Sequence, residues 1–230
     1  MVDSISTGLA GDTMLSEAAA AVSMNDIYRY QRYIYDATRR YFLLGRLHLI
    51  ENLSPPEKAD ILEVGCGTAW NLIRAARTYP QAQLYGFDIS TEMLDTAANT
   101  IDREGLRHRI SLAQGDATSF NTQNMFARTT FDRIFISYAL SMIPGWVSVL
   151  EACEVALADG GEIHLVDFGQ CEGLPITFRR LLFAWLEHFS VSPRTRLKEQ
   201  LEHLVLQKNL EIEYSKLYRG YADYAILRRP

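Results

Sequence analysis

The feature that most constrains the fold is an alternation of short apolar runs with amphipathic stretches, which begins after Pro56. Apolar runs of strand length lie at residues 60–64, 83–88, 110–114, 131–137 and 161–167. The stretches between them, at 71–77, 91–104 and 146–158, have helical spacing. Because strands that alternate with helices of this length form a parallel sheet covered on both faces, we expect an α/β fold.

Both ends of the chain depart from this alternation. Residues 176–188 and 196–208 have helical spacing, and residues 211–218 and 221–228 alternate around Arg219-Gly220, which predicts an antiparallel hairpin. At the other end, Ser54-Pro55-Pro56 closes a region with two helical patterns. We therefore predict three parts: a flexible tail at 1–23, an N-terminal helical cap at 24–54, and the main domain at 55–230.

Composition sets the broad class of the protein. With 230 residues, 48% of them hydrophobic, the chain can bury a core without disulfides or metals. No uncharged apolar run reaches about 18 residues, so we expect no transmembrane helix. Three widely spaced cysteines favour a reducing cytoplasm, and five histidines without ligand spacing predict no metal site.

The distribution of charge is uneven. The net charge of −5 argues against a nucleic-acid partner. Basic residues nevertheless outnumber acidic ones in residues 24–46 and again from residue 178 to the end, so the middle of the chain is strongly acidic. The two basic flanks are either ordinary solvated helix faces or a surface that orients the protein on an anionic membrane.

The first candidate site is a glycine turn that follows the first predicted strand, Glu63-Val64-Gly65-Cys66-Gly67-Thr68-Ala69. It is not the dinucleotide fingerprint, because Trp70 replaces the last glycine, and it lacks the lysine of a phosphate-binding P-loop. The carboxylate of Glu63 would repel a phosphate but could accept a hydrogen bond from an ammonium group. The turn therefore favours a cationic nucleoside as ligand.

Two more acids end the next two predicted strands. Asp88 lies 23 residues after Gly65, where an acid can bind both hydroxyls of a ribose. Asp116 is placed to accept a hydrogen bond from an adenine amino group. Each acid alone could be a helix cap, but the three together predict a nucleoside site.

These segments, with residues 131–144, resemble the successive motifs of class I S-adenosylmethionine-dependent methyltransferases over roughly residues 60–230. The resemblance implies a Rossmann-like sheet of seven mostly parallel strands with the last antiparallel, and S-adenosylmethionine as cofactor, leaving S-adenosylhomocysteine as product. It also implies that Ser137 and Tyr138 border the transferable methyl group. The implied cofactor-binding residues are Glu63, Gly65, Cys66, Gly67, Asp88, Ile89, Met93, Asp116, Ala117 and Ser137. Ala69 departs from the family, where many members have a third glycine.

The block from Tyr28 to Arg46 resembles a narrower group, the diacylglyceryl-homoserine N-methyltransferases of betaine-lipid synthesis. This resemblance implies three methylations of a lipid amine, supplied by an upstream lipid-headgroup transferase. Tyr28, Tyr33 and Tyr35 are candidates for holding the ammonium by cation–π interaction, with Tyr35 as a catalytic candidate. Arg46 is a further predicted cofactor contact. Residues 183–186 are either a lipid-facing lid at the inner membrane surface or a buried helix.

Two alternatives remain open from the sequence. The acceptor could be phosphatidylethanolamine or another small amine, which the same aromatic and basic residues would suit. The chain could also be a non-catalytic module that binds the cofactor to regulate a partner.

Overall fold

The computed structural model describes residues 42–230. The chain divides into two compact units, residues 1–43 and 44–230, and the fold below is that of the second. The predicted tail and residues 24–41 of the predicted cap, including Tyr28, Tyr33 and Tyr35, lie outside the described residues. The predicted boundary at residue 55 stays a prediction.

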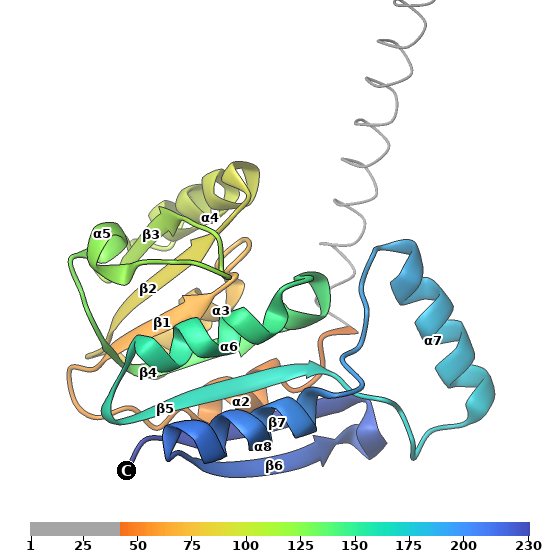
Figure 1. Ribbon diagram of the computed structural model, residues 1–230. Helices are drawn as coiled ribbons and strands as arrows, with labels where there is room; N and C mark the ends of the chain where they lie inside the picture. Colours follow the sequence, from red (N-terminus) through yellow and green to blue (C-terminus); the bar gives the residue numbers. More distant parts are fainter. Residues whose placement is uncertain (1–41) are drawn as a thin grey trace, which may run out of the picture. The chain divides into compact units, whose positions relative to one another are not determined.

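A seven-stranded sheet in the order β3-β2-β1-β4-β5-β7-β6 forms the centre of this unit (Figure 1). Five strands are parallel, whereas β7 is antiparallel to both β5 and β6. This confirms the predicted Rossmann-like fold with an antiparallel last strand. The strands are β1 (Asp60–Val64), β2 (Gln83–Asp88), β3 (Ile110–Gln114), β4 (Phe131–Ser137), β5 (Leu157–Phe168), β6 (Glu211–Leu217) and β7 (Ala222–Arg228).

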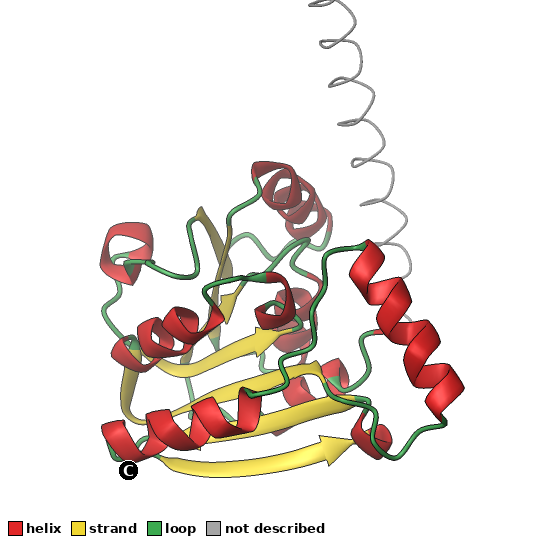
Figure 2. Cartoon of the chain, turned by 45° about the vertical axis from the view of Figure 1, so that its right-hand side comes forward, coloured by secondary structure: helices red, strands yellow, loops and turns green. Residues whose placement is uncertain are grey.

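Helices cover the sheet in two layers (Figure 2). One layer contains α2 (Arg46–Asn52), α3 (Trp70–Thr78) and α4 (Thr91–Arg103), and the other contains α5 (Thr122–Phe126), α6 (Trp146–Val155) and α8 (Leu197–Lys208). Two short 3₁₀ turns, η1 (Leu140–Met142) and η2 (Tyr218–Gly220), follow β4 and β6. Helix α7 (Ile176–His188) stands beyond the end of β5 (Figure 1).

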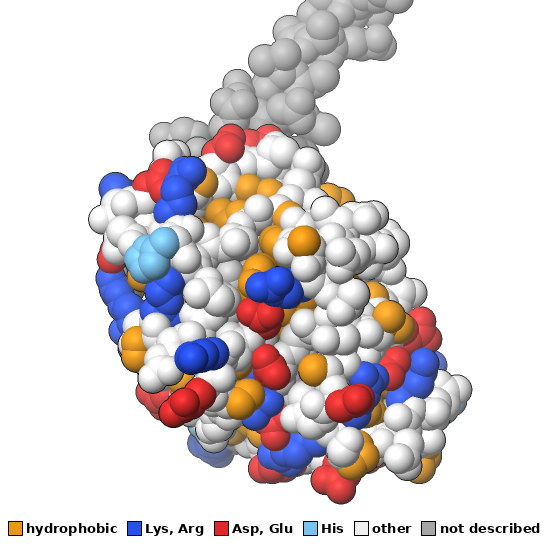
Figure 3. Space-filling view, turned by 90° about the vertical axis from the view of Figure 1, so that its left-hand side faces the viewer, with side chains coloured by type: hydrophobic (Ala, Val, Ile, Leu, Met, Phe, Trp, Pro, Cys, Tyr) orange, Lys and Arg blue, Asp and Glu red, His pale blue; other side chains and the backbone are white. Residues whose placement is uncertain are grey.

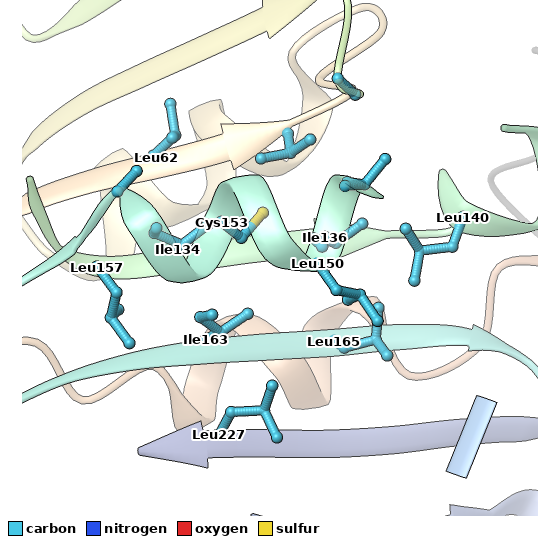
Figure 4. Packing of buried hydrophobic residues seen from close by; sticks show 14 of the residues in the cluster. Leu62, Ile134, Ile136, Leu140, Leu150, Cys153, Leu157, Ile163, Leu165 and Leu227 are labelled. Atoms are coloured by element: carbon cyan, nitrogen blue, oxygen red, sulfur yellow. The ribbon is translucent and has the colours of Figure 1, made fainter. Parts of the chain in front are cut away.

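The central strands are apolar because both of their faces are buried. On one face, side chains of β1, β4, β5 and β7 pack under α6 (Figure 4), and α8 contributes Leu201 to the same cluster. Leu62, Ile134 and Ile163, which are paired across neighbouring strands, are fully buried there. This core fixes the strand ends, where the loops of the candidate site begin.

Two of the predicted elements differ from their predicted boundaries by more than one residue. Strand β5 begins at Leu157 rather than at residue 161, because Phe131 pairs with Leu157 before a shift in register brings Arg133 opposite Glu162. The four residues between are therefore an irregular part of the strand, not a loop. Helix α6 accordingly ends at Val155 rather than at 158.

Candidate functional site

The glycine turn lies at the carboxyl edge of the sheet, between β1 and α3. Gly65 and Gly67 have φ values of +71° and +52°, in the left-handed region that glycine adopts without strain. A Cβ atom on Gly65 would lie 2.9 Å from the Cβ of Ala139, in the loop after β4. The two loops are therefore in close contact, and this turn has no room for a side chain at Gly65.

Glu63 is the last residue but one of strand β1 and is almost fully buried. Its Oε1 accepts a hydrogen bond of 2.6 Å from Nδ2 of Asn71, which lies on the first turn of α3. The amide fixes the carboxylate beside the glycine turn. Sequence reasoning missed Asn71, although its place one turn into the helix after the glycines was a usable signal.

The side chain of Asp88, at the end of β2, joins the glycine turn to the loop that follows β2. Its Oδ2 accepts from the backbone N–H of Gly67 at 2.9 Å, and its Oδ1 accepts from the N–H of Ser90 at 3.0 Å. The side chain of Ser90 in turn caps α4 by accepting from the N–H of Met93. Each carboxylate oxygen keeps a second lone pair, so the group can still accept two hydroxyl hydrogen bonds.

The loops after β2 and β3 carry apolar and polar side chains that are suited to binding a nucleobase. Ile89 is 67% exposed immediately after Asp88, and Met93 lies half-buried in the first turn of α4. Asp116 is exposed, and its carboxylate accepts from both the backbone N–H and the hydroxyl of Thr118, which lowers the pKa of Asp116. Ala117 is buried behind it.

Cys66 is a structural part of the turn. Its N–H donates to the carbonyl of Phe87 at 2.9 Å, which ties the turn to β2. Burial raises the pKa of its thiol well above the ordinary value, and the nearby carboxylates of Glu63 and Asp88 raise it further. The thiol is therefore neutral and unsuited to nucleophilic attack.

Ser137 and Tyr138 lie where the sequence predicted them, at the carboxyl end of β4. The hydroxyl of Ser137 is buried and has no hydrogen-bond partner within residues 42–230. Tyr138 has a φ of +57°, which is rare for a bulky residue and turns the chain sharply. Its hydroxyl donates to the carbonyl of Leu44 at 2.5 Å, and burial raises its pKa well above the usual range.

Arg46 approaches the same edge from the start of α2. Its guanidinium carbon lies 4.2 Å from the centroid of the Trp70 ring, a cation–π contact, and the residue is only 9% exposed. Because Trp70 is the first residue of α3, this contact places a buried positive charge beside the glycine turn. The contact of Trp70 with Arg46 was not predicted from the sequence, in which Trp70 was noted only because it replaces the last glycine of the dinucleotide fingerprint.

The structure thus brings the predicted Glu63, Asp88, Ser137 and Arg46 to one edge of the sheet. The predicted catalytic Tyr35 lies outside the described residues, as do Tyr28 and Tyr33. Within residues 42–230, no three His, Cys, Asp or Glu side chains gather as a metal site would require. None of the described helices is both long and apolar enough to span a bilayer. On the face of the molecule shown in Figure 3, basic and acidic side chains are interspersed.

Comparisons with known proteins agree with this geometry. Residues 61–161 match a family model described as a methyltransferase domain. The demethylmenaquinone methyltransferase of Anoxybacillus flavithermus is 25% identical over 166 residues, which is 72% of this chain and 63% of that enzyme. The chain therefore spans less than two thirds of the length of this curated relative.

Solved structures show the same fold. An O-methyltransferase family 2 protein from Planctomyces limnophilus has a TM-score of 0.66 at 18% identity, covering 88% of this chain and 62% of its own. The phosphoethanolamine N-methyltransferase 2 of Haemonchus contortus, in complex with S-adenosyl-L-methionine, has a TM-score of 0.62 at 17% identity, covering 80% and 51%. The domain match and the fold support a class I methyltransferase with S-adenosylmethionine as cofactor.

Proposed function

We propose that this chain, whose residues 61–161 match a methyltransferase domain, is an S-adenosylmethionine-dependent methyltransferase acting on a small, largely apolar acceptor. The observation that carries the proposal is the hydrogen bond that connects the glycine turn to Asp88. The backbone of Gly67 is hydrogen-bonded to Asp88, and a Cβ at Gly65 would meet Ala139. This arrangement leaves bare backbone and a fixed carboxylate facing a ligand at the carboxyl edge.

The residues of the turn fit each part of the cofactor. The carboxylate of Glu63 would face the ammonium group, directly or through water, and Asp88 would accept from the ribose hydroxyls. Ile89 and Met93 would cover the adenine, whose amino group Asp116 would recognise. When bound, the cofactor supplies a methyl group on a positively charged sulfur. The chain then needs only to align an uncharged nucleophile and exclude water.

Arg46 would bind the carboxylate of the cofactor. The stacked Trp70 ring fixes the guanidinium plane, and a fixed guanidinium suits two parallel hydrogen bonds to a carboxylate. Arg46 and Glu63 would thereby receive the two opposite charges of an amino acid group. The hydroxyl of Ser137 would lie next to this group, and Tyr138 would border the methyl.

Aromatic side chains near this edge support an apolar acceptor. The ring centroids of Tyr138 and Phe168 are 4.6 Å apart, and Tyr221 and then Phe178 continue the series at 6.0 and 6.4 Å. Of these four, Phe178 is exposed. Such rings favour contact with an apolar molecule or with the face of a methylated ammonium.

Two acceptor classes follow. The resemblance of the Tyr28–Arg46 block favours an amine on a lipid headgroup, as in the three methylations of diacylglyceryl-homoserine, with phosphatidylethanolamine as the nearest variant. The name of the curated relative favours demethylmenaquinone as the acceptor. The first acceptor presents an amine to the methyl group, whereas the second is a quinone.

Binding and turnover decide the function in two steps. Isothermal titration should show binding of S-adenosylhomocysteine, and its absence would end the methyltransferase proposal. Incubation with cofactor labelled in the methyl group, and with each acceptor in turn, should then label one lipid after chromatographic separation. Binding without transfer to any acceptor would favour the non-catalytic module.

We further propose that the enzyme meets its acceptor at an anionic membrane surface, where a transferase that builds the headgroup would supply it. Ile176, Phe178 and Leu181 are exposed on α7, beside Arg179 and Arg180. An apolar stripe next to basic side chains is typical of interfacial helices. Sedimentation with phosphatidylglycerol vesicles should exceed that with phosphatidylcholine vesicles, and replacing Leu181 with Glu should abolish the difference. Equal sedimentation with both would contradict the proposal.

A further inference from the structure

The loop that follows β4, residues 138–143, forms one wall of the candidate site. Tyr138 turns the chain, Ala139 meets the glycine turn, and the 3₁₀ turn η1 comes next. A shift of this loop would change the space at Gly65, because the methyl carbon of Ala139 lies where a Cβ of Gly65 would make contact at 2.9 Å. What holds this loop therefore matters for ligand binding.

The backbone of the loop is held by the connection between α7 and α8. Nε of Arg194 donates to the carbonyl of Leu140 at 2.9 Å, and its Nη2 donates to the carbonyl of Ile143 at 2.7 Å. The backbone N–H of Ser192 donates to the carbonyl of Ser141 at 2.9 Å. The loop thus accepts three hydrogen bonds from residues that lie about fifty positions further along the chain.

Asp167 completes the arrangement from the end of β5. Its Oδ2 accepts from the N–H of Ser141 at 3.0 Å, and the carboxylate is fully buried. The positive charge of Arg194 favours the ionised form of this carboxylate, whose pKa burial raises. Arg194 therefore donates to two carbonyls from two nitrogens of its planar guanidinium and also supplies a positive charge that favours the ionised form of one buried carboxylate.

The other end of α7 reaches the same loop through aromatic rings. Phe178, in the first turn of α7, lies next to Tyr221, which is followed by Phe168 and then by Tyr138. The first turn of α7 is therefore connected to residues 138–143 by ring packing, and the segment that follows α7 is connected to them by hydrogen bonds. Nothing in the parallel sheet itself requires this, since α7 stands beyond the sheet (Figure 2).

We propose that Arg194 is a positioning residue that fixes the loop after β4 against the glycine turn, so that α7 controls the affinity for the cofactor. The inference rests on the proposed function, because it assigns the cofactor to that turn. A displacement of the loop by a fraction of an ångström would alter the close approach of Ala139 to Gly65, and with it the shape of the proposed cofactor site. Any molecule that moves α7 would then change cofactor affinity, and the cofactor would change the affinity for that molecule by the same factor.

The test compares three variants by titration with S-adenosylhomocysteine well below the unfolding temperature. Arg194→Met should raise Kd by at least about tenfold. Arg194→Lys should recover part of the affinity, since it keeps the charge beside Asp167 but cannot donate to both carbonyls. Arg196→Met is the matched control: Arg196 is exposed, its side chain bonds only to Glu199 among residues 42–230, and its replacement should leave Kd unchanged.

A second readout follows the loop directly. Hydrogen exchange at the amide of Ser141 should accelerate in Arg194→Met and stay at the wild-type rate in Arg196→Met. A lower melting temperature with unchanged Kd and unchanged exchange would show that Arg194 is merely structural and would overturn the inference. If the wild type itself binds no S-adenosylhomocysteine, the proposed function fails, while exchange at Ser141 still decides whether Arg194 fixes the loop. If Arg194→Met does not fold, the lysine variant carries both measurements.

Discussion

The two ends of the ladder between β5 and β7 differ in how well their charged side chains are paired. At the end of this ladder that is nearer the amino terminus of β5, Glu162 bonds to Nε2 of His164 at 3.0 Å and pairs with Arg133 and Arg228. The hydrogen bond from His164, together with these arginines, lowers the pKa of Glu162 to about 2. The other ring nitrogen of His164 accepts from the hydroxyl of Tyr224, so every member of this cluster has a partner.

At the carboxyl end, Asp167 and Asp223 lie opposite each other across the same two strands. Burial raises the pKa of both, to about 6 for Asp223, whose Oδ1 has no partner within residues 42–230. The amino end is therefore arranged for stability, whereas the carboxyl end tolerates unfavourable charges near the candidate site. Groups with perturbed pKa values are expected to gather at functional edges for this reason.

The largest expected effect on this contrast comes from Arg133→Met. Arg133 is buried, pairs with Glu162, and donates to the carbonyls of Leu53 and Ser54 at the end of α2. Its loss removes one of the three partners of Glu162 and two hydrogen bonds from a charged donor to these carbonyls, so we expect the free energy of unfolding to fall by about 3–5 kcal/mol. Urea denaturation measures the loss.

The control for this change is Arg128→Met, since Arg128 is exposed and pairs with Asp60 at 2.8 Å. We expect it to change the free energy of unfolding little, because water and salt screen an exposed ion pair. Affinity for S-adenosylhomocysteine should remain unchanged in the folded fraction of both variants. A weakened affinity in Arg133→Met would show that the amino end also shapes the site, and the contrast would fail.

At the carboxyl edge, Asp88→Ala should weaken cofactor binding more than it lowers the free energy of unfolding. Removal of two hydrogen bonds to a charged acceptor should weaken cofactor binding by roughly 2–4 kcal/mol, with a smaller loss of stability from the bonds to Gly67 and Ser90. Asp95→Ala, on the exposed side of α4, is the matched control and should leave both quantities unchanged. Equal affinity of Asp88→Ala and wild type would place the cofactor elsewhere.

The regular parts of this contrast were predictable from the sequence, and the irregular parts were not. Strands β1 to β4 have the predicted bounds. Strands β1, β2 and β4 lie inside the sheet and are largely apolar runs, and the partly buried edge strand β3 still ends directly before a glycine. The acids at the ends of β1 and β2 were recognised because their spacing follows from the alternation of strand and helix.

The left-handed backbone of Tyr138 and the hydrogen bond from Ser141 to Asp167 had no local signal. The side chain of Tyr138 contacts Leu44 and Phe168, and Asp167 accepts from Ser141, so these contacts all join distant segments. The five residues of α5 are too few to show helical periodicity. Contacts of high sequence separation thus decide what propensity and spacing leave open.

Asp223 provides a pH test of the same contrast. Below about pH 4 its carboxyl is protonated in both folded and unfolded chains, and it carries no penalty. As the pH rises to about 6 the unfolded chain releases the proton first, so the stability contributed by this group is lost through this interval. Asp223→Asn should therefore be more stable than the wild type at pH 7, by about 1–3 kcal/mol, and similar to it near pH 4.

Glu162→Gln should give the opposite sign. The lowered pKa of Glu162 contributes stability above about pH 4.5, which is lost as the pH falls toward 2, so the glutamine variant should be the less stable one at pH 7. Urea denaturation of both variants and wild type at several pH values measures the two differences. Difference curves of the same sign would show that the two ends of the ladder do not differ as described.

Ile89→Ser should give the smallest effect and isolates binding from stability. Ile89 is 67% exposed, so its replacement should change the free energy of unfolding by less than about 0.5 kcal/mol. If adenine covers this side chain, the apolar area lost from the contact should weaken binding of S-adenosylhomocysteine by about 1 kcal/mol, and Ile89→Leu should restore it. Leu206→Ser, 84% exposed on α8, should alter neither quantity. Because an exposed apolar side chain at the carboxyl edge gains its contact only from a ligand, an unchanged affinity in Ile89→Ser would mean that the base lies away from the end of β2.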